Sequence, residues 1–161
     1  MNRVTHTLEP IYDKNSKTLI LGSMPCIKSR KIGKYYGHSQ NRFWSIMENI
    51  YGEKIDDWKE FILRHNLALF DVIASCDITG SSDASIKNVI PNDIKSIVDK
   101  TKIKNIFLLG RLAYNLYNKY LFDSVGIKGI YLPSPSSANA SISFEKLCET
   151  YKIIKDTTEN D

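Results

Sequence analysis

The sequence Thr18-Leu-Ile-Leu-Gly22 predicts a short strand that is apolar on both faces and ends at a glycine. Three further apolar runs follow it along the chain, at residues 67–74, 105–110 and 129–132. Strands without polar alternation are typical of a parallel sheet that is covered on both faces. The four runs therefore predict a central four-stranded parallel sheet.

Helical spacing of apolar residues fills the gaps between these runs. Phe43, Ile46 and Met47 share one face of a helix. Asn41 stands where the N-cap of that helix would be, and Gly52 stands just past its end. Further helices are expected at residues 56–64, 93–100, 111–120 and from residue 144 onward. Alternating strands and helices predict an α/β fold, namely a three-layer α/β/α sandwich around the parallel sheet.

Length and composition suit one domain with its own core. The chain has 161 residues, of which 42% are apolar and 25% charged. We expect a single domain over residues 1–161, with loose ends at 1–13 and 156–161. No apolar run is long enough to span a bilayer, and the first ten residues lack the apolar stretch of a secretory signal. Three widely spaced cysteines without C-x-x-C fit a reduced compartment, so we expect a cytoplasmic protein that binds no membrane.

The formal net charge of +4 hides an uneven distribution. Residues 14–47 carry seven Lys or Arg and no acid, and residues 100–144 carry six bases and one acid. Between them, residues 48–99 carry ten acids and five bases. If the two basic blocks meet in space, they form a cationic face suited to a polyanion. Accidental clustering of lysines is the alternative.

Unusual stretches follow three predicted strand ends, at residues 23–40, beyond Asp71 and at residues 133–140, and ligands bind at such places in this kind of fold. Three segments could carry chemistry. Gly22-Ser-Met-Pro-Cys26 has a glycine that lets a ligand approach the backbone and a proline that stiffens the turn. Tyr35-Tyr-Gly-His-Ser-Gln-Asn-Arg-Phe-Trp44 combines aromatic faces for stacking with side chains that bind phosphate. Leu132-Pro-Ser-Pro-Ser-Ser-Ala-Asn-Ala140 offers hydroxyls, an amide and backbone donors ahead of a helix. Plain turns and helix caps are the alternative for each segment.

Several other kinds of site are absent from the sequence. It contains no G-x-S-x-G elbow, no phosphate-binding G-x-x-x-x-G-K-[ST] loop and no G-x-G-x-x-G. The three histidines are too far apart in sequence for a typical metal site, and the zinc deaminase signature is missing. Cys26 lies beside a basic loop, but no base accompanies it that would make it a nucleophile. We therefore expect no metal.

Together, the three segments resemble the uracil-DNA glycosylase superfamily, as do Leu67-Ala-Leu-Phe-Asp-Val72 and Ser75-Cys76. They are most similar to the hypoxanthine-DNA (deoxyinosine) glycosylase branch, with its patterns G-S-x-P-G, Y-Y-x-H-P-x-N-x-F-W and L-P-S-x-S-x-A-N-A. The resemblance runs from about Leu19 to Phe144. It implies a four-stranded parallel sheet flanked by helices, in agreement with the pattern of apolar runs.

The chain departs from the branch at three places. Cys26 replaces the glycine that closes the first pattern, and its Cβ would narrow the pocket or shift the backbone, with an effect on base preference. Ser39-Gln40 replaces Pro-Arg, which would change the backbone contacts of that loop. Leu108-Leu-Gly110 replaces an F-N-G-like strand end, which would affect packing more than chemistry.

The resemblance implies a DNA repair enzyme whose partner is DNA containing deaminated bases. It would flip out hypoxanthine or uracil and hydrolyse the N-glycosidic bond, leaving an abasic site and an uncut strand. Asn41 is the implied catalytic residue; because an amide is not a strong base, it would orient the water. The implied base pocket consists of Gly22, Ser23, Met24, Pro25, Tyr36, Gly37, His38 and Asp71. The implied DNA-binding loop consists of Ser134, Ser136, Ser137, Ala138 and Asn139.

Within that pocket, Tyr36 would stack on the flipped base and Asp71 would accept an N–H from it. A buried acid that fixes a loop is the alternative for Asp71. The resemblance also implies no cofactor, a monomer, and association with the nucleoid. Both basic blocks contain motifs expected to touch DNA, which favours a functional meaning for the charge pattern. Two other functions stay open, a non-catalytic binder of damaged DNA with the same fold and a hydrolase of free nucleosides, although a neutral nucleoside needs no cationic face.

Overall fold

The computed structural model describes residues 2–80 and 82–160. A four-stranded parallel sheet lies at its centre, in the order β3-β2-β6-β7. Its strands are β2 (Thr18–Gly22), β3 (Leu67–Asp71), β6 (Asn105–Leu109) and β7 (Gly129–Leu132). Every residue of β2 and β3 is buried, which is why the sequence shows them as unbroken apolar runs. The predicted central sheet is confirmed.

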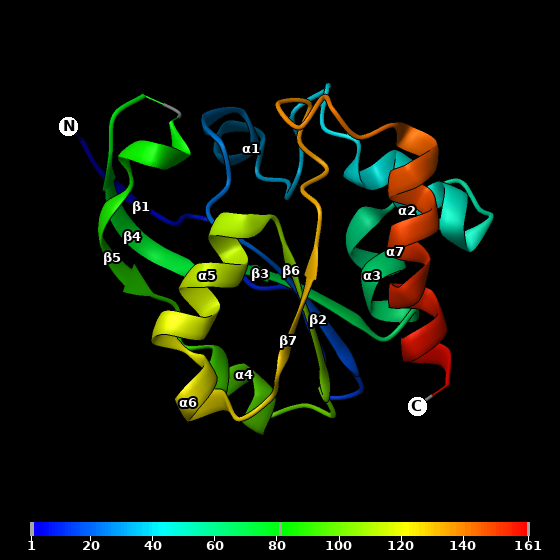
Figure 1. The fold of residues 1–161 in the computed structure, drawn as a ribbon. Helices are drawn as coiled ribbons and strands as arrows, with labels where there is room; N and C mark the ends of the chain where they lie inside the picture. Colours follow the sequence, from blue (N-terminus) through cyan, green and yellow to red (C-terminus); the bar gives the residue numbers. More distant parts are fainter. Residues whose placement is uncertain (1, 81, 161) are drawn as a thin grey trace.

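Helices cover both faces of this sheet (Figure 1). On one side lie α2 (Phe43–Tyr51), α3 (Trp58–Arg64) and α7 (Phe144–Glu159). On the other lie α4 (Ile94–Asp99), α5 (Arg111–Tyr120) and α6 (Phe122–Val125). The expected three-layer α/β/α sandwich is confirmed.

A second sheet, of three antiparallel strands, was not predicted. It consists of β1 (Asn2–Thr5), β4 (Ile73–Ile78) and β5 (Lys87–Pro91), in the order β1-β4-β5. The single strand expected at residues 67–74 is therefore wrong, because the chain leaves the central sheet after Asp71 and enters β4. Residues 75–78 and 87–91, for which no strand was predicted, belong to β4 and β5. These strands bury few side chains, so their sequence carries little apolar signal.

The loose ends expected at residues 1–13 and 156–161 are contradicted at residues 2–5, at Ile11 and at residues 156–159. At the beginning, β1 pairs with β4 over its whole length, and Ile11 bridges to Leu69. At the other end, α7 continues to Glu159, and the Oγ1 of buried Thr158 lies 2.6 Å from the Oγ1 of Thr18. Backbone pairing and one pair of hydroxyls hold these polar ends, and neither leaves an apolar pattern in the sequence.

The long polar segment after β2 contains a short helix, α1 (Ile27–Ile32), which was not predicted. Cys26 caps it, because its sulfur accepts a hydrogen bond from the Ser29 N–H at 3.5 Å. A structural role thus accounts for this cysteine. Helix α1 folds the segment back over the carboxyl end of the central sheet, close to the loop that follows β7 (Figure 1).

Candidate functional site

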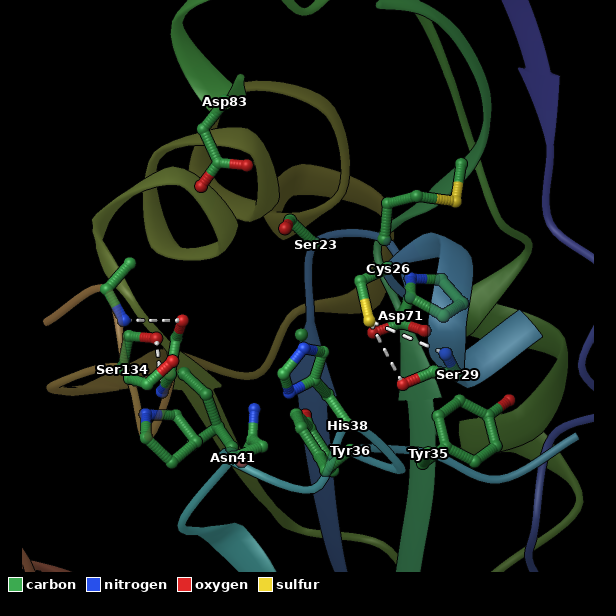
Figure 2. A pocket seen from close by; sticks show the side chains of 18 residues that line it. Ser23, Cys26, Ser29, Tyr35, Tyr36, His38, Asn41, Asp71, Asp83 and Ser134 are labelled. Carbon is green, nitrogen blue, oxygen red and sulfur yellow. Dashed lines mark hydrogen bonds between the residues drawn. The ribbon is translucent and has the colours of Figure 1, made fainter. Parts of the chain in front are cut away.

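A cavity of about 570 Å³ opens at the carboxyl ends of β2 and β3. Its wall brings together the turn after β2, the segment from Tyr35 to Asn41, and the Ser-Pro loop after β7 (Figure 2). Of the predicted site residues, twelve line it: Gly22, Ser23, Met24, Pro25, Tyr36, His38, Asn41, Asp71, Ser134, Ser136, Ser137 and Ala138. The three segments predicted from sequence therefore meet at one place.

Two predicted residues do not line the cavity but support it. The N–H of Gly37 donates to the Ser29 hydroxyl at 3.0 Å, which ties the tyrosine segment to α1. The Nδ2 of Asn139 donates to the backbone oxygen of Ser134 at 3.1 Å, which closes the Ser-Pro loop on itself. These two positions act on the geometry of the loops.

Gly22 forms the floor of the cavity because nothing larger fits there. A Cβ at this position would lie 2.6 Å from Asp71 Oδ1 and 2.9 Å from the Tyr36 hydroxyl oxygen. Real Cβ atoms do not approach other atoms so closely, so a side chain would displace both groups. The glycine thus lets an acidic and a phenolic oxygen converge on the same point.

Tyr36 has a strained backbone and an unusual hydroxyl. Its φ is +56°, and its ring stacks on Phe43 with centroids 4.2 Å apart. The hydroxyl oxygen is buried, and the described residues give it no hydrogen-bond partner. Burial, helped by the charge of Asp71, raises the pKa of Tyr36 well above its usual value, so the group stays protonated and can donate. Stacking on a flipped base stays a prediction, with one ring face already occupied by Phe43.

Asp71 is the last residue of β3, and its carboxylate is buried against His6. This partner was not predicted from the sequence. Asp71 Oδ2 lies 2.8 Å from His6 Nε2, and both side chains are only 4% exposed. The backbone oxygen of Asp71 accepts from Asn92 Nδ2 at 2.8 Å, which fixes the strand end. Asp71 thus presents one oxygen to His6 and the other to the point above Gly22.

Asn41 precedes α2 at the edge of the cavity. Its Oδ1 accepts from the Phe43 N–H at 2.9 Å, and its own N–H donates to the His38 oxygen at 2.9 Å. The first bond closely resembles the expected cap, although the cap position itself falls one residue later, on Arg42. Within the described residues, Asn41 Nδ2 has no protein acceptor, and Figure 2 shows the amide facing the cavity.

Arg42 joins the tyrosine segment to the Ser-Pro loop. Its guanidinium donates to the backbone oxygens of Ile142 at 2.7 Å, Ser136 at 2.9 Å, Asn139 at 3.0 Å and Pro135 at 3.3 Å. Its backbone N–H also donates to Pro135. One side chain therefore sets the loop's position relative to Asn41.

Inside the Ser-Pro loop, serine side chains organise the backbone. The Ser134 hydroxyl accepts from the Ser136 N–H at 3.1 Å, and the Ser136 hydroxyl accepts from the Ala138 N–H at 3.2 Å. Ser137 and Ala138 are exposed at the tip. The loop therefore has a fixed shape and presents its tip to solvent beside the cavity.

Six further residues line the cavity without having been predicted: Cys26, Ser29, Tyr35, Asp83, Leu109 and Pro135. Asp83 begins the 3₁₀ turn Asp83–Ser85 and points towards the cavity in Figure 2. Although Asp83 is exposed, nearby protein partly removes water from its carboxyl group and raises its pKa. It brings a second acid to the mouth of the site.

The cations at this end of the molecule come mostly from the first basic block. Helix α1 and the turn after it carry four of them, at residues 28–34. The lysines at residues 100–104 and Lys128 precede parallel strands, and Lys119 lies near the end of α5. All of these lie at the end of the sheet where the parallel strands begin, opposite the cavity. The expected union of both basic blocks in one face is wrong, because only Arg111 of the second block lies at the cavity end.

Within the described part of the chain, no group of three His, Cys, Asp or Glu side chains could hold a metal ion. Among residues 2–80 and 82–160, no helix has the length and apolar character needed to cross a membrane.

The sequence and the structure of this chain are similar to those of known proteins. A family model described as the uracil DNA glycosylase superfamily matches residues 9–156. A hypoxanthine DNA glycosylase of Methanosarcina acetivorans is 32% identical over 151 residues, covering 90% of this chain and 94% of that protein. One of Methanosarcina barkeri is 30% identical over 135 residues, covering 81% and 85%. A solution NMR structure of a candidate uracil DNA glycosylase from M. acetivorans superposes with a TM-score of 0.81 at 27% identity, covering 96% of this chain and 98% of that one.

Proposed function

The chain belongs to the uracil DNA glycosylase superfamily, and from this membership we propose that it is a DNA glycosylase for deaminated bases. Hypoxanthine is the first candidate base, because both curated relatives described above are named for it. Uracil is the second candidate. DNA is the substrate of a glycosylase of this kind. The observation that carries the proposal is the joint cavity, in which Asn41, Asp71 and the Ser-Pro loop share one wall.

Asp71 reads the base in this proposal. A carboxylate accepts hydrogen bonds and does not donate them. Hypoxanthine presents an N1–H and uracil an N3–H, each next to a carbonyl oxygen, whereas adenine and cytosine have a ring nitrogen acceptor at that place. The Tyr36 hydroxyl, which stays protonated, lies close to the same point above Gly22 and supplies a donor for the carbonyl.

The reaction is hydrolysis of the bond between C1′ of the sugar and the base nitrogen. The oxygen of a water molecule bonds to C1′, the C1′–N bond breaks, and its electron pair leaves with the base. The base gains a proton and the water loses one, so the products are the free base and an abasic sugar. Asn41 orients the water through its amide, since it cannot act as a strong base.

The proposed enzyme is monofunctional, meaning that it leaves the strand uncut. Strand cleavage through a Schiff base needs an amine at the sugar, and no lysine is among the described residues that line the cavity. We also propose that it acts as a monomer, as the resemblance to this superfamily implies.

DNA approaches the cavity past the Ser-Pro loop. Ser134, Ser136, Ser137, Ala138 and Asn139 form this proposed contact. Small hydroxyls and backbone donors suit phosphate oxygens, and contacts of this kind position a duplex without reading its sequence. The cations of α1 lie on the same end of the molecule and strengthen binding in a salt-dependent way.

The test is an excision panel on oligonucleotides with hypoxanthine, uracil, xanthine or a G·T mismatch, in single and double strands. We expect free hypoxanthine and an alkali-labile abasic site. Asn41→Ala should lower the single-turnover rate by about 100-fold while DNA binding persists. Asn49→Ala, an exposed asparagine on α2, is the matched control. Binding of damaged DNA without release of any base would refute the enzyme and favour a non-catalytic binder.

A further inference from the structure

Asp71, in the cavity wall, binds a buried histidine, His6. Among the described residues, no other acid of the cavity wall has a histidine partner, and the proposed reaction does not use His6. Its Nε2 lies 2.8 Å from Asp71 Oδ2, across 65 positions of sequence. Because a carboxylate oxygen only accepts, Nε2 is the donor in this bond. In this pair, His6 is therefore the donor and Asp71 Oδ2 the acceptor, while the other oxygen of Asp71 faces the base site.

Strand β1 places this imidazole. Pairing of β1 with β4 carries the chain to His6, whose N–H donates to the Ala74 oxygen at 2.7 Å. The ring then lies edge-on to Phe70 at 5.1 Å and tilted against Tyr35 at 6.1 Å. Backbone and ring contacts thus fix the imidazole independently of Asp71.

The two carboxylate oxygens of Asp71 therefore have different surroundings. His6 binds Oδ2, while Oδ1 points at the space above Gly22, 2.6 Å from where a Cβ would stand. No described residue donates a hydrogen bond to Oδ1. A carboxylate held at one oxygen offers the other as an acceptor in a set direction, whereas an unheld one rotates about its Cβ–Cγ bond.

We propose that His6 is a positioning residue that orients Asp71 as a hydrogen-bond acceptor for the base and thereby sets the preference for bases with a ring N–H. The inference rests on the proposed function. Without the imidazole donor, neither oxygen of the carboxylate is held, and the group can rotate about its Cβ–Cγ bond. Oδ1 then no longer points in a set direction at the N1–H of hypoxanthine. His6 also spreads the negative charge of Asp71, so that the electron pair leaving with the base meets less repulsion.

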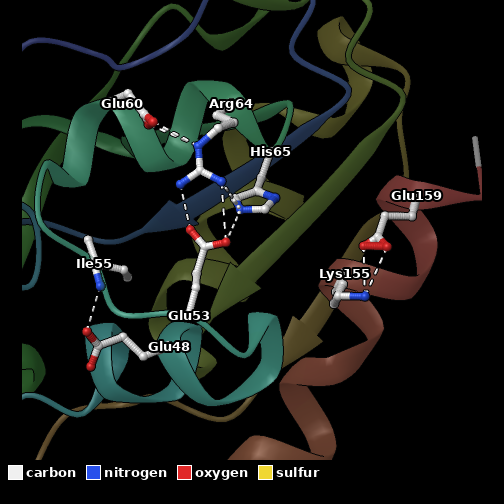
Figure 3. A network of polar contacts seen from close by, with 8 residues as sticks. All are labelled: Glu48, Glu53, Ile55, Glu60, Arg64, His65, Lys155 and Glu159. Atoms are coloured by element: carbon white, nitrogen blue, oxygen red, sulfur yellow. Dashed lines mark hydrogen bonds and ion pairs between the residues drawn. The ribbon is translucent and has the colours of Figure 1, made fainter.

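The test compares two bases in the same duplex: hypoxanthine, and 1-deazahypoxanthine, in which C–H replaces N1–H. Single-turnover excision rates are measured for the wild type, His6→Ala and His6→Gln. Glutamine keeps a donor near the position of Nε2. His65→Gln is the matched control. His65 also faces a carboxylate, that of Glu53 at 3.4 Å, but in a network between the turn after α2 and the end of α3, away from the cavity (Figure 3).

We expect the wild type to prefer hypoxanthine by about 100-fold, since the analogue leaves a charged acceptor without its hydrogen bond. His6→Ala should reduce this preference to below about 5-fold, mainly through slower excision of hypoxanthine, and His6→Gln should restore most of it. His65→Gln should match the wild type. A purely structural role for His6 would lower both rates equally and leave their ratio intact.

An unchanged ratio in both His6 variants would overturn the role of His6 while leaving the glycosylase intact. If His6→Ala does not fold, His6→Phe, which keeps a ring beside Phe70 and Tyr35 but has no donor, takes its place, and an unchanged ratio in that variant overturns the positioning role. A wild-type protein that excises no deaminated base would overturn the proposed function and this inference together.

Discussion

Replacing Arg42 should separate the Ser-Pro loop from the catalytic segment. Its guanidinium reaches four backbone oxygens over residues 135–142, three of them within 3.0 Å. Buried charge-assisted hydrogen bonds contribute about 1.5–3 kcal/mol each, but this site is half-buried and the released oxygens can bind water. Counting about 1 kcal/mol for each of the three short bonds gives a loss of roughly 3 kcal/mol for Arg42→Ala.

Arg42→Lys keeps the charge but offers one nitrogen in place of three, so we expect about half of that loss. For a chain of this length, the melting temperature should fall by about 6–12 °C in the alanine variant and about half as much in the lysine variant. Amide exchange at residues 134–142 should accelerate by at least 10-fold in both, because the loop opens locally. Excision should slow through weaker productive binding of DNA.

Arg111→Ala provides the comparison for loss of charge alone. Arg111 lies at the same end of the sheet and stacks over Tyr131 at 4.2 Å. Its loss should reduce the salt dependence of DNA binding while amide exchange in the Ser-Pro loop stays at the wild-type rate. If Arg42→Lys retains wild-type loop exchange and excision, the reasoning about the guanidinium contacts is refuted.

Three further predictions concern the cavity floor and the helices beside it. Gly22→Ala should destabilise the fold by about 1–3 kcal/mol and lower excision, because the new Cβ displaces Asp71 and Tyr36; thermal melts and single-turnover rates check this, and an unaltered rate would contradict the close approach. Tyr36→Phe should leave the melting temperature unchanged or slightly raised, since its buried hydroxyl has no partner among the described residues, yet slow excision by about 10-fold. Tyr51→Phe removes another hydroxyl that these residues leave unpartnered, and as the control it should keep the wild-type rate. The Arg64 guanidinium lowers the pKa of Glu53 below its usual value of 4.5, so this contact stabilises the fold above that pH and is lost as the pH falls through the lowered value (Figure 3). Acid titration of Glu53→Gln should therefore show less loss of stability below pH 4.5 than the wild type, and identical acid curves would contradict the link.

The central sheet could be predicted from the sequence because burial leaves a direct signal. Residues 18–22 and 67–71 are buried on both faces and contain unbroken apolar runs. The second sheet could not, because β1 has four mostly exposed residues and β5 carries Lys87 and Asn88. Such strands are held by backbone hydrogen bonds, which every sequence can make.

The candidate site was predictable to the extent that its chemistry lies in contiguous motifs. The turn at Gly22, the segment before α2 and the Ser-Pro loop each concentrate unusual residues and meet at one cavity. His6 was missed because its partner lies 65 positions away and nothing near it in sequence marks β1 as a strand. The role of Arg42 was hidden as well, because its acceptors are backbone oxygens that any residues would supply.

The distribution of charge was misleading for a topological reason. Parallel strands alternate with helices that run back in the opposite direction. The cations of one basic stretch of sequence therefore lie partly at the amino ends and partly at the carboxyl ends of the strands. The lysines before β6 lie at one end, whereas Arg111, only a few residues later, lies at the other. Proximity in sequence therefore does not predict proximity on such a surface.

The most direct test of the account is the identity of the product released from DNA. A duplex with a single deoxyinosine is incubated with the wild-type protein, and the soluble fraction is analysed by mass spectrometry for free hypoxanthine. We predict free hypoxanthine in a quantity equal to the abasic sites formed, with an uncut strand. Asn41→Ala should lose both the free base and the abasic sites. Intact deoxyinosine in DNA that the protein binds firmly, or a cut strand with the base still attached, would contradict the account.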